Sequence, residues 1–105
     1  MISVEVVSVS PAPLARVTGR LDAQTAQEFQ DAVLSLVGKA DHATRLDFSG
    51  VEYVSSMGLR AIAVTAKAAA RKGFSLRLSD VRPEVYSILR RCGFDTFMEI
   101  NRHES

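Results

Sequence analysis

The spacing of apolar residues alternates between the two-residue repeat of a β-strand and the longer repeat of a helix, and this alternation most limits the possible folds. Strands are predicted near residues 2–9, 14–21, 46–51, 74–79 and 97–100, and helices near 23–37, 59–70 and 83–92. The order ββαβαβαβ with short connections predicts an α/β fold, in which three main helices cover a mixed sheet through right-handed crossovers. One domain is expected to span residues 1–105.

The N-terminal strand has an irregular pattern. Apolar and polar residues alternate from Ile2 to Val6, whereas Val7 and Val9 shift the register. This shift indicates either a β-bulge or a strand covered on both faces. A proline-containing turn at 11–13 makes an antiparallel hairpin with the second strand the simplest connection.

Local signals set the expected ends of the next elements. Asp22 is predicted to be the N-cap of the first helix, because its carboxylate can accept hydrogen bonds from free backbone amides. Gly38 is expected to stop that helix, and Ser49-Gly50 to form a turn after a short strand. The apolar stripes of the other two helices are Leu59, Ile62, Ala63, Ala66 and Ala70, and Val85, Ile88, Leu89 and Cys92.

Composition excludes several classes of function. The chain has 13 basic and 12 acidic residues, so it lacks the basic excess of a nucleic-acid-binding protein. Its single cysteine, Cys92, cannot form an internal disulfide, which fits a reducing compartment such as the cytoplasm. No secretory signal and no apolar segment of membrane-spanning length is present, so direct membrane insertion is not expected.

Sequence motifs for catalysis and cofactors are mostly absent. No glycine-rich phosphate-binding motif occurs, and no cofactor is expected. His42 and His103 lack partners at metal-ligand spacing, so no metal site is expected. Ser56-Met57-Gly58 matches only the second half of the Gly-x-Ser-x-Gly hydrolase motif, because position 54 is Val. A serine hydrolase is therefore the third alternative, and a non-enzymatic protein is expected.

The pair Ser55-Ser56 stands between a buried strand and an amphipathic helix. A serine here can cap the helix by accepting hydrogen bonds from its first amides. It can also accept a phosphate, whose charge the positive helix end would tolerate without unfolding of the domain. Spacing alone favours capping over phosphorylation.

Three segments resemble the STAS domains, the family of bacterial anti-sigma factor antagonists. The segment 46–60, LDFSGVEYVSSMGLR, resembles the signature strand, loop and helix of that family. The segment 19–26, GRLDAQTA, resembles its second strand and first helix, and 81–100 resembles its last helix and closing strand. The resemblance implies a STAS-like fold over essentially the whole chain, and it favours phosphorylation at the serine pair.

The resemblance also implies a mechanism. It places the phosphorylated serine two positions before the motif glycine, at Ser56, with Ser55 as the alternative. The partner would be an anti-sigma factor that is also a serine kinase of the GHKL type, with a phosphatase as a further partner. The unphosphorylated chain would bind this partner and release a sigma factor. The partner-binding residues implied in this way are Asp22, Ser55, Ser56, Met57, Gly58 and Arg60.

Some details of this assignment remain open at the level of the sequence. Many phosphorylated members have Asp before the serine, where this chain has Ser55. Met57 is expected in a loop, where it could contact a partner, and Tyr53 either lies in the core or flanks the site. Arg60 is either solvated or faces an acidic patch of the partner. A rival function is that of an accessory subunit of a lipid or other transporter complex, because solitary STAS domains also resemble such components.

Overall fold

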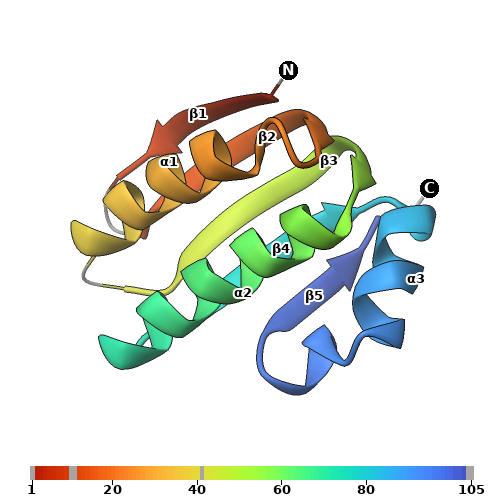
Figure 1. The fold of residues 1–105 in the computed structure, drawn as a ribbon. Helices are drawn as coiled ribbons and strands as arrows, with labels where there is room; N and C mark the ends of the chain where they lie inside the picture. The colour runs from red at the N-terminus through yellow and green to blue at the C-terminus, as the bar shows by residue number, and fades with distance from the viewer. Residues whose placement is uncertain (1, 10–11, 41, 104–105) are drawn as a thin grey trace.

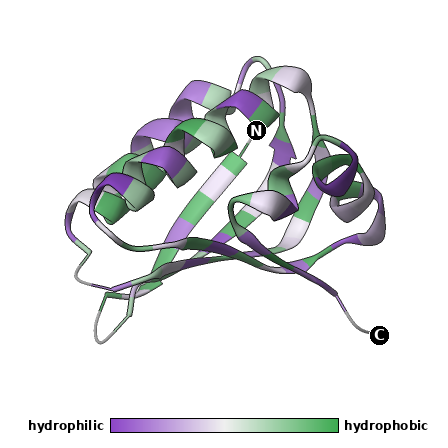
Figure 2. Cartoon of the chain, turned by 90° about the horizontal axis from the view of Figure 1, so that it is seen from below, coloured by the Kyte–Doolittle hydropathy of each residue, from purple (hydrophilic) through white to green (hydrophobic). Residues whose placement is uncertain are grey.

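A five-stranded sheet with helices on one face forms the framework of the molecule (Figures 1 and 2). The computed structural model describes residues 2–9, 12–40 and 42–103. The elements in chain order are β1 (Ile2–Ser8), β2 (Leu14–Leu21), α1 (Ala26–Gly38), β3 (Thr44–Val54), α2 (Ser56–Arg71), β4 (Leu76–Val81), α3 (Pro83–Arg91), the short 3₁₀ helix η1 (Phe94–Thr96) and β5 (Glu99–Arg102). This order confirms the predicted ββαβαβαβ α/β fold.

The strands follow one another across the sheet in the order β1-β2-β3-β4-β5. β1 pairs with β2 antiparallel, as the predicted hairpin requires, and the other three pairings are parallel. Each crossover moves to the next strand in the same direction, so right-handed connections place every helix on the same face. Figure 2 shows α1, α2 and α3 on that face, while the other face of the sheet carries none of the helices that the structure describes.

The core lies between the sheet and the helices. Phe29 of α1 and Phe48 of β3 are fully buried and meet edge to face, with ring centroids 6.2 Å apart. Ile62 of α2, predicted from its helical stripe, is also fully buried. Charged residues of neighbouring strands form ion pairs across the open face of the sheet: Arg16 with Glu5 and Asp47, and Arg77 with Glu99.

The C-terminal ends of α1 and α2 are joined by one side chain. Lys72, which follows α2, donates from Nζ to the carbonyl oxygens of Val37, Gly38 and Ala40 at 2.9–3.0 Å. The last turn of α1 has no basic residue of its own. The ammonium group of Lys72 therefore supplies both the missing hydrogen-bond donors and the positive charge that a helix C-terminus favours.

The irregular N-terminal strand is explained by a bulge. The register between β1 and β2 shifts between Val6 and Ser8, which confirms the bulge. The alternative of two covered faces is wrong, because Val6, Val7 and Val9 are each about half exposed. The turn predicted at 11–13 falls partly outside the description, since Pro11 is not among the described residues.

Several predicted boundaries are wrong. α1 begins at Ala26 rather than at 23, because a separate turn follows Asp22, and Gly38 is its last residue rather than a stop beyond it. The predicted turn at Ser49-Gly50 does not form: β3 continues to Val54 past a shift in its pairing with β2. A β-carbon at Gly50 would lie 2.9 Å from the Thr18 hydroxyl oxygen, so glycine permits this close pairing.

The C-terminal part differs from the prediction at two apolar residues. α3 ends at Arg91, so Cys92, which was predicted to belong to its apolar stripe, lies beyond the end of the helix and is exposed. Gly93, with a φ of 80°, then turns the chain into η1, which the sequence did not predict. β5 begins only at Glu99, and Phe97 is 52% exposed instead of belonging to the strand.

Candidate functional site

The carboxyl ends of β2 and β3 bring the predicted site residues to one edge of the sheet. The two strands are parallel neighbours, so the chain leaves both at the same end, with Asp22 after β2 and Ser55 after β3. A hydrogen bond from Ser55 N to the Leu21 carbonyl oxygen, 2.9 Å long, ties the two segments together. Topology thus unites residues that lie more than thirty positions apart in the sequence.

The two adjacent serines have different environments. Ser55 is the N-cap of α2: its backbone is extended, and its Oγ accepts a hydrogen bond from Gly58 N at 3.3 Å. Ser56 is the first residue of α2 and is exposed. Within the described residues its hydroxyl has no hydrogen-bond partner. Ser55 therefore caps the helix, whereas Ser56 presents the hydroxyl that is free of such a bond.

Gly58 allows α2 to approach the end of β2 closely. A β-carbon at this position would lie 2.5 Å from the Leu21 carbonyl oxygen and 2.9 Å from Leu21 Cγ. Glycine has no side chain and Gly58 is buried, so this residue presents no surface of its own to a partner. Its part in the site is to fix where the first turn of α2 lies, and therefore where Ser56 is displayed.

Asp22 organises a turn ahead of α1. Its Oδ1 accepts hydrogen bonds from Gln24 N, Thr25 N and the Thr25 hydroxyl at 3.0–3.2 Å. The position directly before α1 belongs to Thr25, which makes no side-chain cap bond to the helix. The prediction that Asp22 caps α1 is therefore wrong. Its carboxylate accepts hydrogen bonds from amides of the preceding turn and not from those of the helix.

The charge of Asp22 is held by these hydrogen bonds. Desolvation by burial raises the pKa of Asp22, but the hydrogen bonds from Gln24 and Thr25 outweigh it and hold the pKa below its ordinary value of 3.8. Arg20 Nε lies 4.0 Å from Asp22 Oδ2. Asp22 therefore stays ionised at neutral pH and gives the site one fixed negative charge.

The lowered pKa of Asp22 predicts a pH dependence of stability. Its ionised form favours folding above 3.8, the unfolded value, and this contribution disappears as the pH falls through the lower folded value. Asp22→Asn should therefore lose less unfolding free energy than the wild type on acidification, as measured by urea unfolding across this range. Asp95→Asn, at an exposed position in η1, is the matched control. Equal acid sensitivity of Asp22→Asn and the wild type would contradict the assignment.

Three further side chains surround the serines. Tyr53 is 40% exposed and flanks the site, with the Arg20 guanidinium carbon 4.3 Å from its ring centroid. Met57 is 48% exposed but lies in the first turn of α2, so its predicted loop position is wrong. Arg60 is exposed, and it forms no ion pair with any residue that the structure describes.

The contact between Arg20 and Tyr53 was not predicted from the sequence. The two residues are cross-strand partners of β2 and β3, beside a shift in the pairing register. The register that brings these two side chains together depends on where the bulges fall, and the sequence does not reveal those positions.

Metal-ligand clusters and membrane-spanning helices are both absent from the described part of the chain. No group of three or more His, Cys, Asp or Glu residues there could hold a metal ion. His103 Nδ1 lies 3.5 Å from Asp80 Oδ1, at the end of the sheet opposite to the loop that contains His42. None of the described helices is both long enough and apolar enough to cross a bilayer.

The fold and the site define a class of small α/β module: a sheet covered on one face, with a capped helix that displays a free serine at its start. The chain belongs to the STAS domain family, whose model matches residues 3–105. This membership and the observed order of elements confirm the resemblance and the fold expected from the sequence. Among curated proteins, none matches the chain.

Solved structures with the same fold include two bacterial regulators. An anti-sigma factor antagonist from Mycobacterium paratuberculosis is 22% identical with a TM-score of 0.84, over 96% of this chain and 86% of that one. SpoIIAA, a Bacillus cell fate determinant in its phosphorylated form, is 14% identical with a TM-score of 0.70, over 95% and 90%.

A transporter shares the fold as well. The murine anion transporter Slc26a9 is 21% identical with a TM-score of 0.76, over 89% of this chain but only 16% of the transporter. At sequence identities this low, the similarity of the chain to these three structures shows that they share a fold.

Proposed function

We propose that this chain is an anti-sigma factor antagonist controlled by phosphorylation of Ser56. In this proposal it acts in the cytoplasm by binding, not by catalysis. Its partner is an anti-sigma factor that is also a GHKL-type serine kinase, and ATP is the substrate of that partner. The unphosphorylated chain sequesters the partner and frees a sigma factor, phosphorylation ends the contact, and a phosphatase restores it.

The observation that carries the proposal is the environment of Ser56. Its hydroxyl is exposed and free, whereas that of Ser55 is half-buried and engaged in the cap. A kinase can therefore reach Ser56 without breaking the N-cap of α2. The fold neighbours support this reading, because they include anti-sigma factor antagonists and one that is phosphorylated.

A phosphate on Ser56 would be compatible with the folded domain. Phosphoserine adds about −1.5 to −2 charges at pH 7. The first turn of α2 has no acidic residue, and the positive end of the helix dipole favours an anion there. The added charge would therefore change the surface that a partner meets far more than it changes the fold.

The site of modification gives the direct test. Incubation with ATP and each candidate GHKL-type kinase from the same genome should add one phosphate, measured by intact mass, and peptide mapping should place it on Ser56. Ser56→Ala should abolish the addition, and Ser55→Ala should retain it despite a weaker cap. A phosphate mapped to Ser55 would refute the residue assignment but keep the mechanism. No phosphate with any candidate kinase would count against the proposal as a whole.

A second candidate function is that of an accessory subunit of a lipid or other transporter complex. The observation that favours it is the fold shared with part of an anion transporter. Co-purification with a transporter, together with no phosphate transfer from any kinase, would select this alternative.

A further inference from the structure

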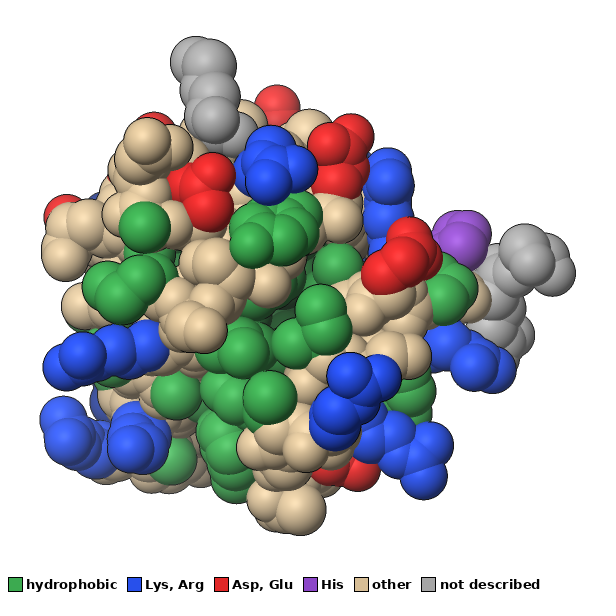
Figure 3. Space-filling model, turned by 45° about the vertical axis from the view of Figure 1, so that its right-hand side comes forward, with side chains coloured by type: hydrophobic (Ala, Val, Ile, Leu, Met, Phe, Trp, Pro, Cys, Tyr) green, Lys and Arg blue, Asp and Glu red, His purple; other side chains and the backbone are tan. Residues whose placement is uncertain are grey.

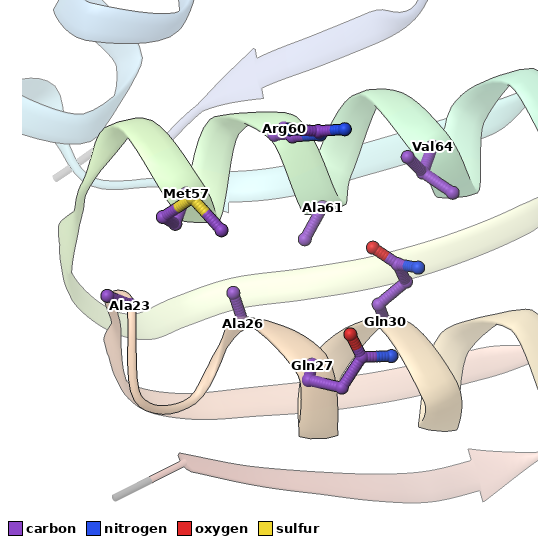
Figure 4. A pocket seen from close by; sticks show the side chains of 8 residues that line it. All are labelled: Ala23, Ala26, Gln27, Gln30, Met57, Arg60, Ala61 and Val64. Carbon is purple, nitrogen blue, oxygen red and sulfur yellow. The ribbon is translucent and has the colours of Figure 1, made fainter.

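A groove separates the first turns of α1 and α2, and one of the residues that line it is Met57, which follows Ser56 in the sequence. The groove has a volume of about 350 Å³ and is open to solvent. Figure 4 shows its two sides: Met57, Arg60, Ala61 and Val64 on α2 face Ala23, Ala26, Gln27 and Gln30 on α1 and the turn before it. None of the residues on the α1 side of this groove was predicted from the sequence to bind a partner.

The groove has an apolar floor and a polar rim. Ala26 and Ala61 are nearly fully buried and leave space between the helices because their side chains are small. Met57 forms an exposed, adaptable wall at the end nearest Ser56. On the rim, the Gln30 amide and the Arg60 guanidinium make no hydrogen bond or ion pair with the residues described. Polar groups are thus available beside a site suited to an apolar side chain.

The charge of α2 indicates which chemistry is complementary. Arg60 is exposed and is the cationic residue of α2 that lines the groove, and this helix contains no acidic residue. Figure 3, in which the α3 side of the molecule comes forward, shows a strip of hydrophobic side chains with Lys and Arg on both sides. A segment that enters the groove beside Arg60 would therefore be favoured by a carboxylate next to its apolar anchor.

The length of the groove fits a helix. Met57 and Val64 are seven residues apart on α2, which corresponds to roughly 10 Å along its axis. Two anchor side chains of an amphipathic helix, separated by one helical turn, fit within that length. The groove begins at Met57, beside Ser56, so a single partner could cover both.

We propose that the groove between α1 and α2 binds an amphipathic, acidic helix of the partner, with an apolar anchor between Met57 and Val64 and a carboxylate paired with Arg60. This inference rests on the proposed function, because its occupant is the same kinase partner. It adds the α1 side of the surface and the chemistry of the segment that is recognised.

Paired substitutions on the two flanks of α2 test the groove. Arg60→Glu reverses the charge on its rim, and Ala23→Phe fills it from an exposed position. The matched controls are Lys67→Glu and Ala70→Phe, which make the same changes at a different hollow, lined in part by Phe97. The binding of the unphosphorylated chain to the purified kinase is measured by titration calorimetry, with circular dichroism melts as the folding control. Both groove variants should bind at least tenfold more weakly, and both control variants within threefold of the wild type.

The possible outcomes separate the groove from the switch. If Ser56→Asp weakens binding and Ala23→Phe does not, the groove assignment is wrong and the proposed function remains. Equal losses for Arg60→Glu and Lys67→Glu would also overturn it, because they would indicate a general charge effect. If Ala23→Phe changes only the sedimentation of the isolated chain, a second copy occupies the groove, contrary to the proposal. Absence of any kinase that binds or phosphorylates the wild type removes both proposals together.

Discussion

Replacement of Gly58 by alanine is expected to destabilise the domain by about 3 kcal/mol, at the upper end of the usual range for overpacking. The added methyl group would lie 2.5 Å from the Leu21 carbonyl oxygen, which is backbone and cannot rotate away. The same oxygen accepts the hydrogen bond from Ser55 N, so relief of the clash also disturbs the start of α2. Urea unfolding of wild type and variant measures the difference.

Gly38 provides a matched control for this substitution. It also lies in a helix, but a β-carbon there would have no neighbour within 4 Å. Gly38→Ala should stabilise the protein by about 0.5 kcal/mol, because alanine restricts the unfolded chain more than glycine does. If both variants shift stability in the same direction, the close contact of Gly58 with Leu21 does not determine the packing of α2.

Substitutions of Ser56 should separate folding from binding. Ser56→Ala removes the acceptor hydroxyl and should bind the kinase partner constitutively, whereas Ser56→Asp places a charge in the contact. A desolvated, unpaired charge costs about 1 to 3 kcal/mol, which corresponds to a roughly 5- to 150-fold loss of affinity. The charge lies at the start of α2, so both variants should remain folded. Titration calorimetry against the partner, with thermal melts, measures both properties.

Equal affinities of folded Ser56→Ala and Ser56→Asp would place Ser56 outside the binding surface. The phosphorylation switch would then have to be abandoned, whatever the kinase does to the serine. Ser55→Ala provides a comparison, because it weakens the cap and adds no charge. Its expected effect is a lower melting temperature with nearly unchanged affinity.

The order and type of the elements could be predicted because local periodicity reflects burial on one face. The buried Leu76 and Leu78 stand on either side of the exposed Arg77, and Ile62 lies on the stripe of α2 that the core covers. Ends were less predictable where two signals competed. Asp22 has the residue type of an N-cap, yet its carboxylate organises a separate turn, and Cys92 continues the period of α3 after the helix has ended.

The candidate site was predictable only in part, for a geometric reason. Ser56 and Asp22 lie in recognisable local motifs, and the need for a small residue at Gly58 follows from its place in a helix that packs closely. The contact that requires this glycine, the Leu21 carbonyl, depends on how α2 sits on β2. The α1 side of the groove likewise arises from helix packing, and no local pattern encodes which faces of two helices meet.

The three hydrogen bonds of Lys72 have a consequence for the speed of recognition. They join the far ends of α1 and α2, while Gly58 seats the near end of α2 against the strand that leads into α1. The spacing of the helices is therefore set in the free chain, and the proposed docking between them would require no opening step. Association should then proceed in a single phase at about 10⁵–10⁷ M⁻¹s⁻¹, the range set by diffusion and orientation.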